Sequence, residues 1–230
     1  MSNATSSLPP LLLIDKPTGI SSFDVIRELR RRTGVRKFGH AGTLDPAASG
    51  LMLIGVGQGT KQLTDYIKLD KEYLAEVALG ESRTTGDLEG EIVETAEVTD
   101  LNQATVQHAL QEMTGSLRLP VSAYSAIKKD GIPMYKRARA AAAKGEQVEQ
   151  VPVRDMQVYQ AALLDIYNTD VQGRDRVILK VRFLVGSGTY IRSLAEELGR
   201  RLGYPATLAS LRRTKVGEFC VEKAQLLTDF

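Results

Sequence analysis

The sequence predicts an α+β protein built on a mixed, mostly antiparallel sheet flanked by helices. Strand-like and helix-like segments alternate without the regular strand–helix–strand repeat of a parallel sheet. Two long strand-like segments, 157–166 and 177–185, are separated by a turn around Gly173. With 230 residues, of which 43% are hydrophobic, the chain is long enough to bury a sizeable core.

The first hundred residues predict two helices among several strands. Ser21 or Ser22 caps a helix with Phe23, Ile26 and Leu29 on its apolar face, ending near Gly34. A short helix is expected at 60–67. Four strands are expected, at 11–14, 51–56, 73–79 and 91–98, the last as the hairpin partner of 73–79 across an acidic turn.

Three further helices are predicted in the rest of the chain. One is capped by Asp100 and stopped by Gly115, and another spans 189–202 and is closed by Gly203. The third, 133–144, starts at a proline, is basic and has only a thin apolar stripe. We therefore expect it to be a mobile or ligand-facing element.

Composition excludes several classes of protein. Cys220 is the single cysteine, which excludes an internal disulfide or a cysteine-based zinc site. The longest apolar runs fall far short of the roughly 20 residues needed to cross a bilayer, so no membrane insertion is expected. The N-terminus has no secretory pattern, which predicts a cytoplasmic protein. Residues 1–8 are expected to be disordered or a cloning remnant, followed by one domain over 9–230.

Charge is distributed unevenly along the chain although the net charge is only +2. Segments 27–37 and 128–144 each carry six basic residues against one acidic residue, and 192–215 carries six against two. Segment 81–100 carries seven acidic residues against one basic residue. The basic segments are either ordinary solvated helix faces or, if they converge in space, a surface for a polyanion such as RNA.

The stretch from Gly39 to Gly50 contains the most informative residues. It reads Gly-His-Ala-Gly-Thr-Leu-Asp-Pro-Ala-Ala-Ser-Gly, so one carboxylate, Asp45, is surrounded by small residues that allow a ligand to approach the backbone. By itself, Asp45 followed by Pro46 indicates either a turn or a catalytic group, and His40 is either structural or catalytic.

This stretch resembles the signature of bacterial tRNA pseudouridine synthases of the TruB family, Gly-His-x-Gly-x-Leu-Asp-Pro-x-Ala-x-Gly, at every fixed position. The resemblance extends over about residues 11–220. Further matches follow in the family's order, at 15–19, 71–73, 87–90, 124–128, 188–194 and 211–214. One departure is at 83–85, where the family's Thr-Asp-Thr is replaced by Arg83-Thr84-Thr85.

The resemblance implies a pseudouridine-synthase fold and activity. The expected reaction is the isomerisation of the T-loop uridine of tRNA, position 55, to pseudouridine, with no metal or other cofactor. The expected partner is the tRNA T-stem-loop, with no obligatory protein partner. A thumb-like insertion is expected at about 124–150, and no C-terminal RNA-binding domain is expected, since the chain ends at Phe230.

The resemblance also assigns roles to residues of the site. Asp45 is the expected catalytic carboxylate, Arg192 its ion-pair partner, and Tyr73 the ring that stacks on the base and assists proton removal. Three residues are expected to bind the target nucleotide, His40 in the space left by the flipped base and Tyr190 and Leu211 around the uracil. Four residues are expected to meet the RNA backbone, namely Lys16, Lys128, Arg139 and Arg212.

Two alternative functions remain open. The first is an RNA-binding or tRNA-folding module in which catalysis is secondary or lost. The second is a guide-RNA-dependent pseudouridine synthase, which shares the catalytic core. A glycoside hydrolase is disfavoured because it needs two carboxylates and the signature stretch contains one.

Overall fold

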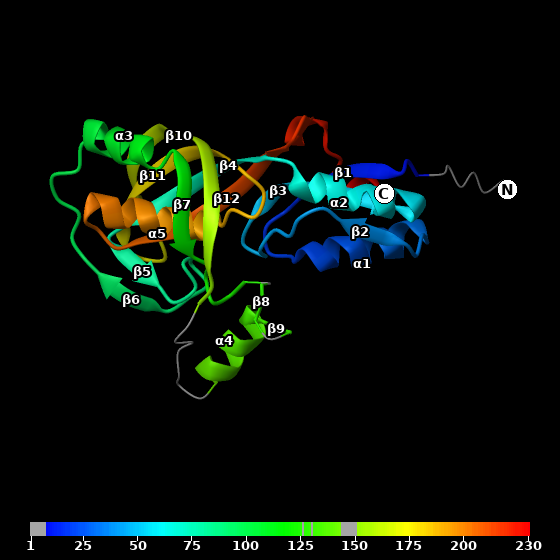
Figure 1. Ribbon diagram of the computed structural model, residues 1–230, viewed down its shortest axis with the longest axis horizontal. Coiled ribbons are helices and arrows are strands. Elements are labelled where there is room, and N and C mark those ends of the chain that lie inside the picture. The colour runs from blue at the N-terminus through cyan, green and yellow to red at the C-terminus, as the bar shows by residue number, and fades with distance from the viewer. Residues whose placement is uncertain (1–7, 126, 130, 144–150) are drawn as a thin grey trace. The chain divides into compact units, whose positions relative to one another are not determined.

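The computed structural model describes residues 8–125, 127–129, 131–143 and 151–230, and these residues form two compact units (Figure 1). Unit one comprises Met1–Leu74 and Leu211–Phe230, and unit two comprises Ala75–Ser210. Unit two is therefore an insertion within the sequence of unit one. Of residues 1–8, which are expected to be disordered or a cloning remnant, 1–7 lie outside the described residues.

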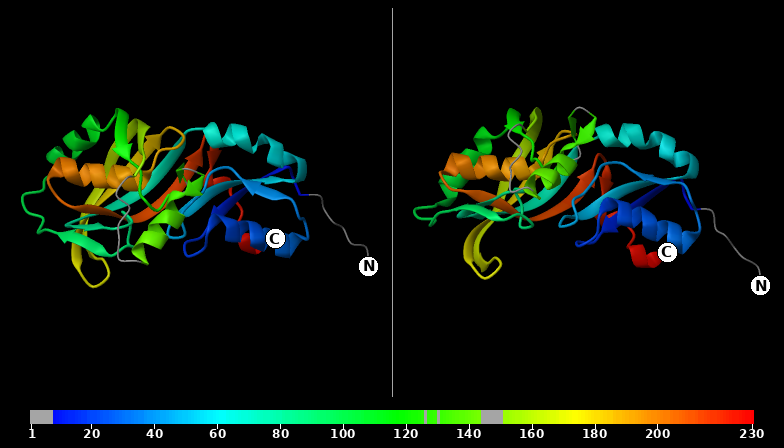
Figure 2. Two further views of the ribbon diagram at one scale, coloured as in Figure 1. Left: turned by 60° about the horizontal axis from the view of Figure 1, so that its bottom comes forward. Right: turned by 90° about the horizontal axis from the view of Figure 1, so that it is seen from below.

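Unit one is built around a buried central strand. Its strands are β1 (Leu11–Lys16), β2 (Phe38–His40), β3 (Ser49–Val56), the end of β12 (Ala206–Val216), and β13 (Phe219–Cys220). Strands β1 and β2 pair with β3 in antiparallel orientation, whereas β12 pairs with β3 in parallel orientation, so the sheet is mixed. Two helices, α1 (Ser22–Thr33) and α2 (Leu63–Lys68), lie on opposite sides of these strands (Figure 2). Three short 3₁₀ helices complete the unit, at Gly57–Gln62, Val221–Lys223 and Leu227–Asp229.

The core of unit one explains why β3 is almost continuously apolar. Because helices cover the strand from both sides, Leu51, Met52, Leu53 and Ile54 are all fully buried. Strand β1 instead alternates, since only every second residue is buried.

Helix α1 begins and ends as predicted. The Ser21 hydroxyl accepts the Asp24 backbone N–H, and the Asp24 carboxylate accepts the Ser21 N–H, which forms a capping box. At the other end Gly34 adopts the left-handed conformation, at φ 71°, and donates its N–H to the Arg30 carbonyl oxygen. These caps fix both ends of the helix, which confirms the predicted end near Gly34 and selects Ser21 from the two predicted caps, Ser21 and Ser22.

Unit two contains a mostly antiparallel sheet with two helices on it. In hydrogen-bonded order its strands are β4 (Lys71–Leu79, which starts in unit one), β11 (Asp175–Val185), β10 (Val153–Asp170) and β7 (Gly115–Pro120). Helices α3 (Gln103–Glu112) and α5 (Ile191–Leu202) lie side by side (Figure 1). The remaining elements are β5 (Glu81–Arg83), β6 (Ile92–Thr95), β8 (Lys128–Lys129), β9 (Ile132–Pro133) and α4 (Met134–Ala142).

The predicted hairpin partner of 73–79 was wrong. Strand β6 pairs with the short strand β5, whereas β4 lies next to β11. The chain leaves β4 at Gly80, where φ is +93° and a Cβ atom would lie 2.8 Å from the Ala96 carbonyl oxygen. Only glycine fits this close approach without strain, so the acidic segment turns away from β4 and forms its own small sheet.

Several predicted boundaries also differ from the structure. The cap of α3 is Asn102, whose side chain accepts the Thr105 N–H, rather than Asp100, which has a positive φ of 55°. Pro133 belongs to β9 and precedes α4 instead of opening it. Strands β7 and β12 were not predicted, because charged residues interrupt their apolar pattern.

The overall fold class agrees with the sequence prediction, being α+β with a mixed, mostly antiparallel sheet. The expected thumb-like insertion remains a prediction. It spans β8, β9 and α4, and residues 126, 130 and 144–150 within it lie outside the described residues. Within the described parts of the chain, no helix has both the length and the apolar character needed to cross a membrane.

Candidate active site

Asp45 lies in unit one, on the loop between β2 and β3, and hydrogen bonds fix the backbone on its N-terminal side. The Ser22 hydroxyl donates to the Leu44 carbonyl oxygen at 2.9 Å and accepts the Leu44 N–H at 2.8 Å. Both residues are buried, so water does not compete for these two bonds. The first turn of α1 therefore holds the residue next to the carboxylate.

The C-terminal side of Asp45 is held in the same way. The Pro46 carbonyl oxygen accepts the Gly19 N–H at 2.8 Å and the Lys16 Nζ at 3.3 Å. The Ala48 N–H donates to the Asp45 carbonyl oxygen at 3.1 Å, which closes a turn. Asp45 is itself half-buried, which leaves its carboxylate within reach of a ligand while its backbone is fixed.

Arg213 on β12 connects this loop to the following strand. Its Nη2 donates to the Gly42 carbonyl oxygen at 3.2 Å and its Nε donates to the Leu51 carbonyl oxygen at 2.7 Å. The Arg213 backbone passes so close to Gly50 that a Cβ atom there would lie 2.3 Å from the Arg213 carbonyl oxygen. Strand β12 therefore explains why glycine occupies positions 42 and 50 of the signature stretch.

The interior of unit one is unusually rich in buried cations. Lys16, Lys71 and Arg213 are each at most 6% exposed. Burial lowers the pKa of Lys16 to about 8, Asp45 opposes this shift and Arg213 adds to it. Burial and Arg213 likewise lower the pKa of Lys71 to about 8. Backbone carbonyl oxygens accept hydrogen bonds from both ammonium groups, so the cations remain solvated by protein in place of water.

Three predicted nucleotide-binding or stacking residues belong to the same unit as Asp45. Tyr73 on β4 is 8% exposed. Leu211 is half-buried on β12 and directly precedes Arg212, which pairs with Ser49 at the end of the Asp45 loop. His40 ends β2, and burial together with the Arg213 cation lowers the pKa of its imidazole, which is therefore neutral at pH 7.

Two residues of unit one that are predicted to contact the RNA backbone already have partners within the protein. The guanidinium of Arg212 forms a two-point ion pair with Asp15, at 3.1 and 2.6 Å. Lys16 is fully buried and donates to three carbonyl oxygens, which favours a structural role for it over a phosphate contact. The side chains of Lys128 and Arg139 lie outside the described part of the structure.

Arg192 lies in unit two, in the first turn of α5, and is only 6% exposed. Its Nη1 donates to the Thr85 carbonyl oxygen at 2.9 Å and to the Ser122 hydroxyl at 3.1 Å, and its Nη2 donates to the Tyr124 carbonyl oxygen at 3.1 Å. The Asp87 carboxylate lies 3.6 Å from Nη1. Several fixed acceptors therefore hold this guanidinium in one orientation.

The predicted site residues are divided between the two units. Asp45, Tyr73, His40 and Leu211 belong to unit one, whereas Arg192 and the half-buried Tyr190 that precedes α5 belong to unit two. The pairing of Asp45 with Arg192 and the roles of these residues toward RNA stay predictions.

Sequence reasoning missed the residues that hold the site in place. The sequence indicates Ser22 only as an alternative helix cap, and Arg213 only as a member of the matched stretch 211–214 and the basic segment 192–215. Asp87 was matched to the family pattern but was given no role. One signal for Ser22 is the pair of consecutive serines, Ser21 and Ser22, at the start of α1, of which a cap needs only one.

Comparison with known proteins identifies the family of this chain. A family model described as TruB family pseudouridylate synthase (N-terminal domain) matches residues 30–191. The tRNA pseudouridine synthase B of Leifsonia xyli subsp. xyli is 44% identical over 220 residues, which cover 94% of this chain and 70% of the relative. That of Corynebacterium glutamicum is 39% identical over 226 residues, which cover 98% of this chain and 73% of the relative.

Solved structures support the same fold. One is an H/ACA ribonucleoprotein bound to a substrate RNA containing 2′-deoxyuridine, at 24% identity and a TM-score of 0.65. Another is an archaeal box H/ACA small ribonucleoprotein, at 25% identity and a TM-score of 0.62. Each match covers 95% of this chain, which spans about half (51%) of the solved chain. With a family model over most of its length and relatives about 40% identical, the chain belongs to the TruB family of pseudouridylate synthases.

Proposed function

We propose that this chain isomerises the uridine at position 55 in the T-loop of tRNA to pseudouridine, with Asp45 as the catalytic carboxylate. The observation that carries the proposal is the Asp45 loop, which matches the family signature and is held on both sides of the carboxylate by hydrogen bonds. A rigid backbone with a half-buried carboxylate is the arrangement that nucleophilic or general-base chemistry requires.

The reaction rearranges one nucleotide without net oxidation or reduction. The C1′–N1 bond breaks, the uracil turns within the pocket, and C1′ forms a new bond to C5. The proton on C5 is lost and N1 gains a proton, so the product is an isomer of the substrate. Two routes agree with this balance, namely attack of the Asp45 carboxylate on C1′ or removal of a C2′ proton by the same carboxylate.

Other residues serve the uracil and the ionised carboxylate. We assign Tyr73 to stacking on the base and to assisting loss of the C5 proton, and Arg192 to pairing with Asp45. A buried carboxylate needs such a partner to remain ionised in a site dry enough to hold a base.

The target base must leave the folded T-loop before it can react. We assign His40 to the space vacated by the flipped base, and Tyr190 and Leu211 to the walls of the uracil pocket. A neutral imidazole suits this role, because an uncharged ring enters a base stack at a lower desolvation cost than a cation.

The T-stem-loop of tRNA is the proposed partner, bound through the basic segments 27–37, 128–144 and 192–215. Helix α1 presents part of the first segment, including the exposed Arg30. Because tRNA is the substrate, we place the protein in the cytoplasm. The proposal requires no metal, nucleotide or protein partner.

Tritium release from T-stem-loop RNA labelled with [5-³H]uridine tests the proposal, because formation of the C1′–C5 bond expels the label to water. We expect release by the purified wild-type chain and no detectable release by Asp45→Asn, which retains RNA binding. Asp65→Asn, an exposed carboxylate on α2, is the matched control and should behave as wild type. Turnover near the wild-type rate by Asp45→Asn would remove Asp45 from the catalytic role.

The same assay separates the alternatives. Tight RNA binding without release by the wild-type chain would favour an RNA-binding or tRNA-folding module. Release that appears only after a guide RNA and partner proteins are added would favour a guide-dependent synthase, as the likeness to H/ACA ribonucleoproteins would allow.

A further inference from the structure

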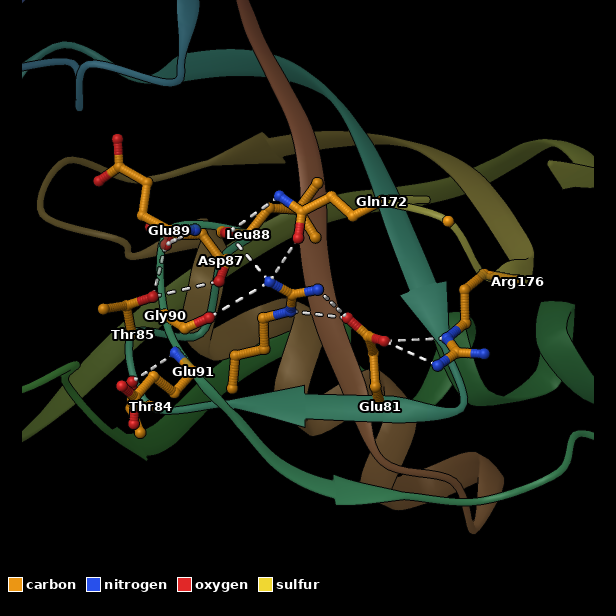
Figure 3. Close-up of polar contacts among 12 residues, drawn as sticks. Glu81, Thr84, Thr85, Asp87, Leu88, Glu89, Gly90, Glu91, Gln172 and Arg176 are labelled. Atoms are coloured by element: carbon orange, nitrogen blue, oxygen red, sulfur yellow. Dashed lines mark hydrogen bonds and ion pairs between the residues drawn. The ribbon is translucent and has the colours of Figure 1, made fainter. Parts of the chain in front are cut away.

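A buried ion cluster lies in unit two beside the turn that holds Arg192. Glu81 on β5 is fully buried, and two arginines share its carboxylate. Arg83 donates Nε to Glu81 Oε1 at 2.6 Å, and Arg176 on β11 donates Nε and Nη2 to Glu81 Oε2 at 3.0 and 2.8 Å. In Figure 3, Arg176 approaches Glu81 from the side opposite Leu88 and Gly90.

The two arginines differ in what else they bind. Arg83 is 8% exposed, and its Nη1 donates to the Leu88 carbonyl oxygen at 3.0 Å, to the Gly90 carbonyl oxygen at 3.2 Å and to Gln172 Oε1 at 2.9 Å. The Nη1 of Arg176 donates instead to the carbonyl oxygen of its neighbour Asp175. Arg83 therefore connects Glu81 to the turn between β5 and β6, whereas the described contacts of Arg176 leave that turn untouched.

The other half of this turn holds the catalytic-site arginine. The Thr85 carbonyl oxygen accepts Arg192 Nη1 at 2.9 Å, and Asp87 Oδ2 lies 3.6 Å from the same atom. Asp87 Oδ1 in turn accepts the Thr85 hydroxyl at 2.5 Å and the Glu89 N–H at 3.2 Å (Figure 3). These hydrogen bonds within the turn couple the positions of its residues. A displacement of Leu88 or Gly90 therefore also displaces the groups that contact Arg192.

We propose that Arg83 is a positioning residue for the isomerisation, acting by fastening the 84–91 turn to the buried Glu81 carboxylate and thereby fixing the orientation of Arg192. This inference rests on the proposed function, in which Arg192 acts at the reacting nucleotide. Arg83 stands where the family pattern usually has threonine. A threonine is too short to reach both a carboxylate and two carbonyl oxygens across the turn.

Arg176 offers a matched control within the same cluster. Each arginine places two nitrogens on one oxygen of Glu81, so Arg83→Gln and Arg176→Gln each remove one cation from the same buried anion. Only the first substitution also releases the turn. A merely structural role for the cluster predicts equal effects on activity, whereas a positioning role predicts a difference.

The experiment compares wild type, Arg83→Gln, Arg83→Lys and Arg176→Gln. Steady-state tritium release from the labelled T-stem-loop gives kcat and KM. The assay temperature is kept well below the melting temperature of every variant. Amide hydrogen exchange of the 84–91 segment gives a readout that does not need activity. Arg83→Lys keeps the positive charge beside Glu81. It therefore still tests the inference if Arg83→Gln does not fold.

We expect Arg83→Gln to lower kcat about 10- to 100-fold with KM within about twofold, the size of effect that a small misplacement of a site residue produces. Arg83→Lys should fall between it and wild type, because the single nitrogen of an ammonium spans a shorter distance between the carboxylate and the turn than the planar guanidinium fork does. Exchange at 84–91 should be faster in both variants. Arg176→Gln should lower the melting temperature but leave kcat and this exchange near wild type.

Two results would overturn the inference, namely wild-type kcat in both Arg83 variants or an equal fall of kcat in Arg176→Gln. A wild-type chain that releases no tritium would contradict the proposed function instead. In that case the hydrogen exchange decides, since unchanged exchange at 84–91 in the Arg83 variants rejects Arg83 as a fastener and faster exchange supports it.

Discussion

Two consecutive serines before the Asp45 loop have separate tasks. Ser21 caps α1 through the Asp24 N–H, whereas Ser22 reaches the backbone of Leu44 with both its donor and its acceptor. The same hydroxyl chemistry thus stabilises a helix in one residue and orients the loop of a carboxylate in the next. At this scale the structure allows stability and activity to be perturbed separately.

We expect Ser22→Ala to lower kcat at least about tenfold, because it leaves a buried amide and a buried carbonyl beside Asp45 without their partner. Ser21→Ala should cost about 1 kcal/mol of unfolding free energy, as the loss of a helix cap does, and leave kcat near wild type. Tritium release and urea unfolding of both variants check the pair. Equal kcat values in the two variants would contradict the role given to Ser22.

Lys71 should make stability depend on pH in the alkaline range. Its pKa is about 8 in the folded protein and 10.5 as the ordinary value, so between these values the unfolded chain binds more protons. The free energy of unfolding contributed by this group therefore rises with pH across that interval. Urea unfolding from about pH 8 to 10.5 should give a more positive slope for wild type than for Lys71→Met. Identical slopes would show that the ammonium is not desolvated.

At the scale of elements, the pairing with β12 restricts which residue type can stand at position 50 of β3. The parallel pairing of Arg213 with Gly50 brings two backbones together where φ of Gly50 is +108°. The pairing brings the Arg213 side chain within hydrogen-bonding distance of the Asp45 loop, at the Gly42 carbonyl oxygen. It also requires a residue without a side chain opposite Arg213. A small change in β3 therefore affects both the sheet and the loop.

Gly50→Ala should lower the unfolding free energy by more than about 3 kcal/mol, since it combines a positive φ with a backbone clash. Gly203→Ala, at φ +81° with no atom within 4 Å of the added Cβ, should cost only about 1 kcal/mol. Chemical denaturation of the two variants measures the difference. Equal costs would mean that β12 can move away from β3.

Elements with local end signals could be predicted from the sequence, and those defined by distant partners could not. Helices α1 and α5 end at Gly34 and Gly203, whose effect is independent of the rest of the chain. Strand β12 was missed because its arginines look exposed in the sequence, although Arg213 is buried against carbonyl oxygens more than 160 residues earlier. The same distance hides the pairing of Arg212 with Asp15. The signature loop was recognised by its residues, but what holds it was not.

At the scale of the whole molecule, the charge distribution predicts how the protein meets RNA. The net charge is only +2, yet acidic residues concentrate in 81–100 and leave three basic segments. A polyanion that contacts these segments releases counterions in proportion to the phosphates neutralised, whatever the net charge of the protein.

We expect the logarithm of the binding constant for T-stem-loop RNA to fall with the logarithm of salt concentration with a slope of about −3 or steeper. The double variant Arg36→Gln with Lys37→Gln, at exposed positions in the first basic segment, should reduce the slope by about 1 to 2. Lys61→Gln with Lys68→Gln, exposed but outside the three segments, is the control with the same charge change. Filter binding over a salt series checks this, and a slope near zero would contradict an electrostatic interface.

The division of unit one into two stretches of sequence has a consequence for synthesis on the ribosome. Gly42 and Arg213, which the structure joins by a hydrogen bond, are 171 residues apart, and all of unit two is translated between them. At about 5–20 residues per second, the interval is on the order of 10–30 s. Throughout it the nascent chain already carries Asp45 but lacks the arginine that anchors its loop. The emergence of β12 from the ribosome therefore sets the earliest moment at which a newly made molecule has a complete Asp45 loop.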